Sequence, residues 1–534
     1  MMQDQKSSAL IRFLPSFTDL AFCLPVILLF GRLNGAKTLL GDGDTGWHIR
    51  TGEWILANGE VPTHDLFSFT KPDAPWFAWE WLSDVIFSLL YRIGGLGPVV
   101  IASILLICLT FALLFQLSVK GGKNRLVALG VIFLAVGGSS VHWLARPHLF
   151  TMFFVVLWLS IIDWAEKGRT RLLWLLPLLM VLWTNLHGGF FTGLVISGTF
   201  AVGKICESSV SKDQKNRVAA KEQALRYCTV TLACAAASLL NPYTYHLHQH
   251  IAAYVFDFTQ LAAVNEFQSL SFHAPPAIFF EVILLLSALS AFQHARKLRF
   301  SEAILMIGWA HLGLMSARNI PLFLIVSAPF VVTTLDELLV LGRERYANLT
   351  DSLPKALTNF CRLDKQMSDL DRKPRLHTGS VATALILCSA ISVHAKSPKL
   401  RAEYDCTLYP VAALQSLQAT IGHRRIFCDD EWGDYLAYRY YPVSRVFIDG
   451  RTDFYGASFG QKYDDIVGVK YNWEEQLDYY RIDTLLLSTR GALAGAAKGS
   501  ARWKTVYDDG IAVMFEAVPP ANKISTLSGN EHLQ

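Results

Sequence analysis

The sequence predicts a mainly α-helical, polytopic membrane protein with a smaller extracytoplasmic α/β domain at its C-terminal end. Of its 534 residues, 52% are hydrophobic and only 17% are charged, whereas soluble domains carry about 25% charged residues. The hydrophobic residues form blocks of helix length separated by short polar stretches, which is typical of a chain that crosses a bilayer repeatedly. After the last block, short strands and helices alternate, as in a layered α/β fold. This pattern excludes a single soluble enzyme domain and a disordered chain.

About eleven apolar segments are predicted to cross the membrane. Several lie near the lower limit of the roughly 17–25 residues that a crossing requires, so their boundaries are approximate. The first segment is not expected to be a cleaved signal peptide, because no small-residue cleavage site follows it and the chain soon re-enters the membrane. The predicted spans are 17–36, 85–118, 126–143, 149–165, 172–185, 188–206, 227–240, 277–293, 301–317, 320–338 and 377–394.

The distribution of basic residues predicts the orientation. If the N-terminus is cytoplasmic, the inner connections carry most of the Lys and Arg residues, and the last of them, 339–376, is the richest. Cytoplasmic loops of membrane proteins show this positive excess. Residues 37–84, 241–276 and 395–534 are therefore predicted to lie outside. The net charge of +4 gives no sign of a nucleic-acid partner, since the basic residues cluster in the inner connections.

The chain divides into a predicted transmembrane domain, 1–394, whose first outer loop is 37–84, and an extracytoplasmic α/β domain, 395–518. Residues 519–534 are polar and predicted to form a flexible tail. Within the α/β domain we expect helices at 410–421, 431–440, 459–467 and 473–481, and strands at 425–428, 445–448, 484–488, 503–508 and 511–517.

Cys406 and Cys428 are the only cysteines predicted to lie outside, where a disulfide persists. Bridging requires a specific geometry of the two Cβ atoms, which the sequence does not define. Whether the two are bridged is therefore left open.

The first outer loop contains two aspartates one residue apart, Asp42 and Asp44, set among three glycines. Two close carboxylates either bind a divalent cation or raise the pKa of one of them, which produces a general base. The alternative is that both cap an interfacial helix starting near Gly46. The presence of His48, and of Glu80 in a Trp-Glu-Trp run at the next membrane entry, favours a site, with His48 and Glu80 as substrate-binding candidates.

This loop also carries a resemblance. The run Asp-x-Asp-x-x-Trp-His-Ile-Arg-Thr-Gly-Glu-Trp-Ile…Val-Pro…Asp-x-Phe-Ser resembles bacterial integral membrane proteins described as glycosyltransferase-like. A first span followed by a long outer loop with an acidic motif is similar to the GT-C class of membrane glycosyltransferases. The resemblance implies a GT-C-like bundle, a polyprenyl-phosphate-linked sugar donor and a catalytic aspartate in this loop, here Asp42 or Asp44. It covers the first outer loop well and the Arg-Pro-His, Asn-x-His-Gly-Gly and Ile-Asp-Gly-Arg elements less specifically.

Polar residues recur at the outer ends of later spans. Arg146 and His148 precede the fourth span, His187 lies between the fifth and sixth, and Arg318 lies between the ninth and tenth. Ionisable residues at this depth are costly unless they face a cavity or a partner, so their convergence predicts a site that binds the donor phosphate. The alternatives are histidines hydrogen-bonded between helices and, for Arg318, a headgroup anchor. Glu266 is a candidate second carboxylate.

In the outer domain, Asp449, Arg451 and Asp453 follow a predicted strand, where sites are often built. We expect them to bind acceptor or substrate. The alternative is that Asp449 and Arg451 pair with each other and close the turn.

The sequence therefore predicts an inverting membrane glycosyltransferase on the outer face of the bacterial cytoplasmic membrane. Asp42 or Asp44 would deprotonate an acceptor hydroxyl on a lipid, polysaccharide or protein, and polyprenyl phosphate would leave. Cofactor dependence, with Mg²⁺ or Mn²⁺ as candidates bound by Asp42 and Asp44, is left open. The alternative is a non-enzymatic transporter or envelope-assembly component whose outer domain binds a partner. Sugar, acceptor and oligomeric state are not predicted.

Overall fold

The computed structural model describes residues 11–257, 264–346, 352–371 and 373–518, which fold into two compact units. We call them the helical unit and the sheet unit. The helical unit comprises Met1–Thr63 and Phe77–Glu403, and the sheet unit comprises His64–Trp76 and Tyr404–Gln534. The division thus follows Glu403 rather than residue 394, and a segment of the first outer loop belongs to the sheet unit. The predicted tail, 519–534, lies outside the described residues.

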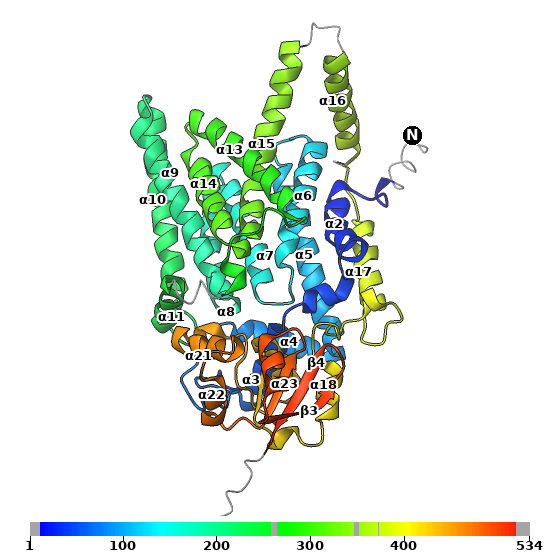
Figure 1. Ribbon diagram of the computed structural model, residues 1–534. Coiled ribbons are helices and arrows are strands. Elements are labelled where there is room, and N and C mark those ends of the chain that lie inside the picture. Colours follow the sequence, from blue (N-terminus) through cyan, green and yellow to red (C-terminus); the bar gives the residue numbers. More distant parts are fainter. Residues whose placement is uncertain (1–10, 258–263, 347–351, 372, 519–534) are drawn as a thin grey trace, which may run out of the picture. The chain divides into compact units, whose positions relative to one another are not determined.

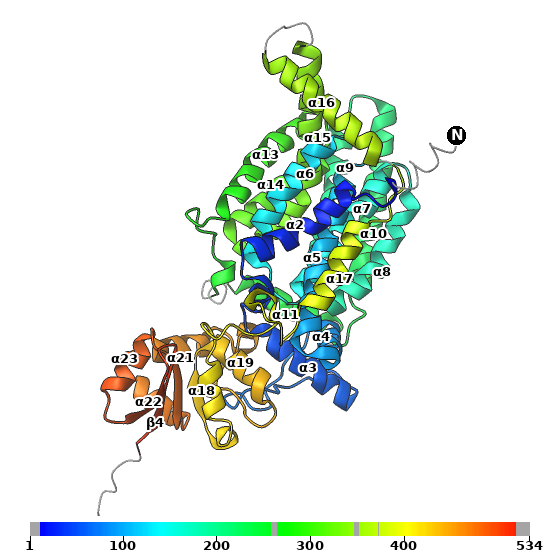
Figure 2. The same ribbon diagram turned by 90° about the vertical axis from the view of Figure 1, so that its right-hand side faces the viewer.

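The helical unit is a bundle in which helices far apart in sequence pack together. Helices α2, α5 and α17 lie side by side in both views (Figures 1 and 2). The helices are α2 (Phe17–Gly31), α3 (Asp44–Asn58), α4 (Trp81–Gly94), α5 (Leu96–Ser118), α6 (Arg125–Ser139), α7 (His148–Glu166), α8 (Leu175–Leu186), α9 (Phe191–Val210), α10 (Gln214–Ala237), α11 (Tyr245–Phe256), α13 (Ala277–Arg296), α14 (Phe300–Met315), α15 (Ile320–Tyr346), α16 (Ser352–Asp371) and α17 (Thr378–Ala390).

Six helical stretches in the described part of the chain are long and apolar enough to cross a membrane, and four apolar helices are shorter. The expected count of eleven spans is therefore not confirmed. The predicted span 85–118 is two helices, because Gly95, with φ of +69°, ends α4 before α5 begins. The long stretches are Leu96–Ser118, Arg125–His142, His148–Glu166, Gly188–Val210, Ala277–Arg296 and Ala317–Arg345.

Helices α3 and α4 pack so closely that their backbones nearly touch. Gly52 of α3 faces the carbonyl group of Asp84 in α4, and a Cβ atom at position 52 would collide with that carbonyl oxygen. Glycine is required where two backbones approach this closely. The contact fixes α3, which carries Asp44 and His48, against the start of α4, which follows Glu80.

The sheet unit contains a four-stranded sheet in the order β1-β2-β4-β3. Strands β1 and β2 are parallel, with Ile426 opposite Thr484, and the other two pairs are antiparallel. Strands β3 and β4 form the hairpin visible in Figure 1. The elements are β1 (Ile426–Cys428), β2 (Thr484–Ser488), β3 (Trp503–Asp508), β4 (Ala512–Ala517), α18 (Val411–Ser416), α19 (Asp430–Tyr440), α20 (Thr452–Tyr455), α21 (Ala457–Val467), α22 (Trp473–Tyr479) and α23 (Ala492–Gly499). Helices α20 and α23 were not among the predicted elements.

The predicted strand at 445–448 is wrong as a member of this sheet. Val446 instead forms an isolated parallel bridge with Ser68, in the segment that the first outer loop contributes. The Val446 N–H donates to the Phe67 carbonyl at 2.9 Å, and the Phe69 N–H donates to the Val446 carbonyl at 3.0 Å. An apolar run predicts a strand but not its partner, which here lies nearly 400 residues earlier in the chain.

The two outer cysteines are not bridged. Cys406 is exposed, whereas Cys428 is buried at the end of β1, and both are free thiols. Their different environments resolve what the sequence left open.

Candidate functional site

The paired aspartates lie where a 3₁₀ turn, Gly35–Leu40, leads into α3. The helix begins at Asp44, and the Asp42 Oδ1 atom accepts a hydrogen bond from the Asp44 N–H at 2.7 Å. The neighbouring Thr45 hydroxyl donates to the Ala145 carbonyl at 2.9 Å. Asp42 therefore bonds to the helix start, as the capping alternative expects of it, whereas Asp44 is the first residue of the helix and pairs with Arg146. The Thr45 contact brings the motif beside the segment that carries Arg146.

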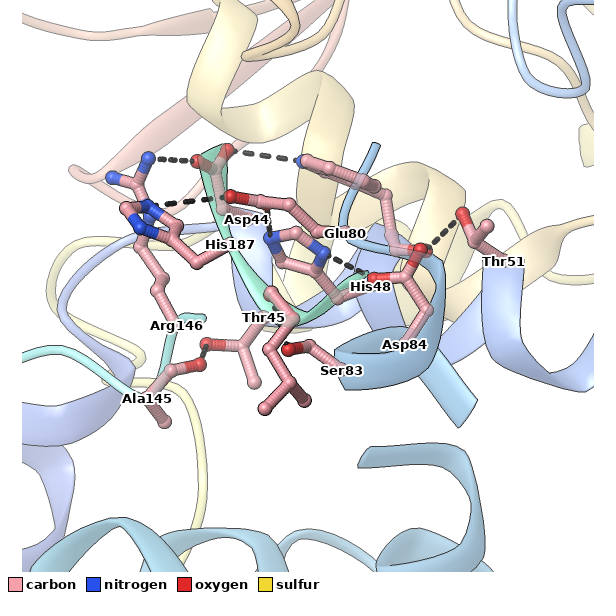
Figure 3. A network of polar contacts seen from close by, with 12 residues as sticks. Asp44, Thr45, His48, Thr51, Glu80, Ser83, Asp84, Ala145, Arg146 and His187 are labelled. Carbon is pink, nitrogen blue, oxygen red and sulfur yellow. Dashed lines mark hydrogen bonds and ion pairs between the residues drawn. The ribbon is translucent and has the colours of Figure 1, made fainter. Parts of the chain in front are cut away.

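Arg146 joins the two aspartates to a third carboxylate. Its Nη1 atom lies 2.9 Å from Asp42 Oδ2. Its Nη2 atom lies 2.7 Å from Asp44 Oδ2 (Figure 3). The same Nη1 atom lies 3.5 Å from Glu266 Oε2. Glu266 in turn pairs through Oε1 with Arg318 Nη1 at 2.7 Å. The sequence candidates Asp42, Asp44, Arg146, Glu266 and Arg318 thus form one ion-pair network within the helical unit.

Three carboxylates and two guanidinium groups leave the network with one negative charge in excess. The pKa values of its carboxyl groups shift in different directions. Burial and the Asp42 charge raise the pKa of Asp44 to about 7, although Arg146 opposes the shift. Glu266 is also buried, but Arg318 and Arg146 outweigh that effect and lower its pKa to about 2. Asp44 therefore exchanges a proton near neutral pH, while Glu266 stays ionised.

A second network lies beside the first. His48 Nδ1 is 2.6 Å from Asp84 Oδ1, and His48 Nε2 is 3.5 Å from Glu80 Oε2. Glu80 Oε1 is 3.3 Å from His187 Nε2, and His187 Nδ1 is 2.7 Å from the Thr151 hydroxyl. Glu80 lies between the two imidazole rings (Figure 3). These contacts connect α3, the start of α4, the α8–α9 junction and α7 through buried polar side chains.

Burial favours the neutral forms of both His48 and Asp84. Desolvation, with Arg146 and His187 nearby, lowers the pKa of His48 well below its usual value. Desolvation and the Glu80 charge raise the pKa of Asp84 well above its usual value. The short contact with Asp84 holds the His48 ring in position.

A cavity of about 430 Å³ adjoins both networks, and residues of the helical unit line it. One part of the wall is polar and includes the predicted site residues His148, His187 and Arg318 together with Glu80 and His142. His148 Nε2 contacts the His142 carbonyl at 2.9 Å, and its Nδ1 atom has no hydrogen-bond partner among the described residues. The remaining wall is largely apolar and includes Met152, Phe191, Ile251, Val255, Phe256 and Leu322. A cavity with these walls suits a ligand that has both a lipid part and an anionic part.

Comparison with known proteins defines the fold. No protein-family model and no curated protein sequence matches the chain. The archaeal oligosaccharyltransferase AglB from Archaeoglobus fulgidus, in complex with an inhibitory peptide and a dolichol-phosphate, is similar in structure, with a TM-score of 0.55 and 12% identity over 94% of this chain and 74% of that chain. The apo form of the A. fulgidus oligosaccharyltransferase matches with a TM-score of 0.56 and 12% identity, covering 88% of this chain and 69% of that chain.

The chain therefore has the fold of a GT-C-type membrane glycosyltransferase. A third structure, of the A. fulgidus oligosaccharyltransferase with zinc and sulfate, matches with a TM-score of 0.54, 12% identity and coverage of 94% of this chain and 73% of that chain. In this protein, no group of three or more His, Cys, Asp or Glu residues within the described ranges is arranged to hold a metal ion.

The predicted outer-domain site has a different character. The Arg451 Nη2 atom lies 2.7 Å from Asp449 Oδ2 and 2.7 Å from Asp65 Oδ1. All three residues are at most 3% exposed, and the guanidinium lies over the rings of Phe67 and Trp76. Asp449 and Arg451 therefore close a turn, as the alternative expects, and in addition fasten the segment His64–Trp76 within the sheet unit.

Asp453 lies half-buried in the short helix α20. A substrate role for Asp449, Arg451 and Asp453 stays a prediction.

Sequence reasoning missed Asp84, His142 and Thr151. Asp84 follows Glu80 by four residues at the start of α4, so the two carboxylates share a helix face, and this spacing was the available signal. His142 is the last residue but one of the predicted span 126–143 and was hidden in that apolar run. Nothing in the sequence marks Thr151, because its role comes only from its contact with His187.

Proposed function

We propose that the protein transfers a sugar from a polyprenyl-phosphate-linked donor to an acceptor hydroxyl on the outer face of a bacterial cytoplasmic membrane. One observation carries the proposal. A cavity whose polar wall contains Arg318 and three histidines, and whose remainder is largely apolar, adjoins the ion-pair network of Asp44, a buried carboxyl group that titrates near neutral pH. The GT-C-type fold, and the dolichol-phosphate bound to one protein of that fold, support this class of donor.

The donor would occupy the cavity. Its prenyl chain would pack against the apolar wall near Phe191 and Leu322, and its phosphate would face Arg318, His148 and His187. A guanidinium binds phosphate oxygens through two N–H groups, and donors aimed at the leaving oxygen stabilise the charge that develops there. Arg146 is already held by Asp42 and Asp44, so we assign it to positioning these aspartates rather than to the phosphate.

Asp44 is the proposed general base. It would take the proton of the acceptor hydroxyl, whose oxygen attacks the anomeric carbon. The bond between that carbon and the phosphate oxygen breaks, and polyprenyl phosphate leaves with the electron pair. A single displacement of this kind inverts the anomeric centre. A base with a pKa of about 7 is half ionised at neutral pH, which suits proton abstraction there.

The acceptor class is a lipid, a polysaccharide or a protein. The inhibitory peptide bound to the archaeal oligosaccharyltransferase supports a peptide acceptor for that fold, and the present site does not distinguish among the three. The transporter alternative requires a polar path across the membrane midplane. The networks described above instead gather at the α6–α7, α8–α9 and α14–α15 connections, which meet at one end of the bundle.

The test uses membranes that contain the wild-type protein or one of the variants Asp44→Asn and Asp42→Asn. Each is supplied with labelled polyprenyl-phosphate sugars and an envelope fraction as acceptor. We expect transfer by the wild type and a loss of about 10²–10⁴-fold in Asp44→Asn. A smaller loss is expected for Asp42→Asn, which keeps Asp44 in place. Undiminished transfer by Asp44→Asn would reject this residue as the base. No transfer by the wild type with any donor would favour the transport or assembly role.

A further inference from the structure

The paired aspartates and the zinc in one structure of the same fold raise the question of a divalent cation at Asp42 and Asp44. Divalent cations bind several oxygen atoms at about 2.0–2.6 Å from a single point. The three carboxylates that surround this position come from two separate segments of the helical unit, and they do converge. The group that lies between these carboxylates determines whether a metal ion can bind there.

A guanidinium group lies between these carboxylates. Asp42, Asp44 and Glu266 each face a nitrogen of Arg146, at 2.9, 2.7 and 3.5 Å. The oxygens are spread along the two arms of the fork rather than around one centre. The remaining carboxylate oxygens are also engaged: Asp42 Oδ1 with the Asp44 N–H, Asp44 Oδ1 with the indole N–H of Trp47 at 3.1 Å, and Glu266 Oε1 with Arg318. The donor set therefore does not fit a metal while Arg146 is in place.

The Arg146 guanidinium also supplies the positive charge that a bound metal ion would supply. It stays protonated at all physiological pH values, and its burial beside Asp42, Asp44 and Glu266 holds its pKa above the usual value. Because three carboxylates depend on it, removal of the guanidinium would leave uncompensated negative charges in a buried place. These uncompensated carboxylates would attract another cation.

We propose that the Arg146 guanidinium is the built-in cation of this site and stands where a divalent metal ion would otherwise bind, so that the wild-type protein has no divalent-cation site at Asp42 and Asp44. The proposal concerns cation binding alone. It does not depend on the proposed glycosyl transfer, and failure of one leaves the other standing.

The experiment is a Mn²⁺ titration of the purified full-length protein in nanodiscs, with free Mn²⁺ followed by electron paramagnetic resonance. The wild type is expected to show no saturable site. The variant Arg146→Ala exposes three carboxylates and is expected to gain one Mn²⁺ per chain, bound at least about tenfold tighter than by the wild type. The double variant Arg146→Ala/Asp44→Asn is expected to lose most of that gain.

Arg125→Ala is the matched control. Arg125 is buried to a similar degree, with its side chain 12% exposed against 15% for Arg146, but among the described residues its guanidinium pairs with one carboxylate, Asp371, at 2.8 Å. Its backbone N–H, which the substitution keeps, donates to Asp364 Oδ1. Removal of the guanidinium leaves a single carboxylate of this pair, which does not make a metal site, so no Mn²⁺ gain is expected. A similar gain in both variants would show general loosening of the bundle and would overturn the proposal.

Two other results would also overturn it. One is stoichiometric Mn²⁺ binding by the wild type that Asp44→Asn weakens. The other is an Arg146→Ala protein that melts like the wild type yet binds no Mn²⁺. If Arg146→Ala is unstable, Mn²⁺ is expected to raise its melting temperature without affecting that of the wild type. If the variant cannot be isolated even with Mn²⁺, the wild-type titration and its Asp44→Asn counterpart decide: a saturable site that Asp44→Asn weakens rejects the proposal, and the absence of such a site supports it.

Discussion

A buried arginine in each unit holds aspartates together, and the two clusters have different roles. Arg146 of the helical unit joins Asp42 and Asp44, and Arg451 of the sheet unit joins Asp65 and Asp449, with closest contacts of 2.7 Å in both clusters. In the Arg451 cluster every residue is at most 3% exposed. The Asp42 side chain is 23% exposed, and the Arg146 cluster connects through Glu266 to Arg318 in the wall of a cavity.

The difference lies in how the carboxylates are satisfied. Asp65 accepts hydrogen bonds from the Phe67 N–H and from the N–H and hydroxyl of Ser68, and Asp449 accepts one from the Tyr455 hydroxyl. Such a closed cluster holds a fold together. The pKa of Asp44 is instead raised to about 7, first by burial and also by the Asp42 charge. The comparison indicates that an ion cluster is suited to chemistry when it connects to a cavity and contains a carboxyl group that titrates near neutral pH.

The largest effect is expected from Arg451→Ala. Removing one partner of a buried ion cluster costs about 3–5 kcal/mol, because the remaining carboxylates lose their compensating charge. The free energy of unfolding of the sheet unit, followed by limited proteolysis in urea, is the measurement. Arg502→Ala is the control, since Arg502 is 41% exposed and pairs with Asp478 at the surface. A sheet unit that keeps its stability without Arg451 would contradict the structural role and restore a ligand-binding role for this residue.

A smaller effect, on activity rather than stability, is expected from Arg318→Ala. Loss of one donor to the leaving phosphate is expected to lower kcat/KM for the lipid-linked sugar by about 10–100-fold. Melting temperature should change little, because Arg318 is partly exposed and its ion-pair partner Glu266 keeps Arg146 as a second partner. Steady-state transfer at varied donor concentration measures the effect, and Arg318→Lys should recover part of it. Equal losses in stability and activity would place Arg318 with the structural cluster.

The smallest effect is a dependence on pH. Asp44 acts as a base only when ionised, so the transfer rate is expected to fall by up to about tenfold per pH unit below about pH 7 and to level off above it. Folding stability should run the opposite way. The folded-state pKa lies above the unfolded value, so the folded state binds more protons and loses stability as the pH rises towards 7. A rate that is flat between pH 5 and 8 would exclude Asp44 as the titrating base.

The sequence predicted the positions of helices and strands more accurately than the contacts between them. Hydropathy located most helices, because an apolar run of helix length has few other structures in a bilayer. Hydropathy also predicted that Asp44, Arg146 and Arg318 lie on the same side of the membrane, because every second connection between successive spans lies on that side. It did not predict that Arg146 holds Asp44, since pairing depends on side-chain direction in three dimensions. It joined 85–118 into one span, because Gly95 lies inside a continuous apolar run.

In the sheet unit the limits were different. Short strands such as β2 are visible as apolar runs, but the run at 445–448 pairs with a loop segment almost 400 residues away and is not part of the sheet. The Asp-Gly-Arg-x-Asp motif around Arg451 suggested a binding site, because Asp65, with which Arg451 forms an ion pair, lies equally far away in the chain. Contacts of this range carry no local sequence signal.

The most direct test compares Asp44→Asn with Asp449→Asn, two isosteric changes beside the two arginines. For each variant, unfolding free energy and sugar transfer are measured in the same preparation. Asp44→Asn is expected to lose about 10²–10⁴-fold in transfer and to keep or gain stability above pH 7. Asp449→Asn is expected to lose stability while any folded fraction transfers at the wild-type rate. Full transfer by Asp44→Asn, together with selective loss of transfer by a stable Asp449→Asn protein, would contradict the account and place the chemistry in the sheet unit.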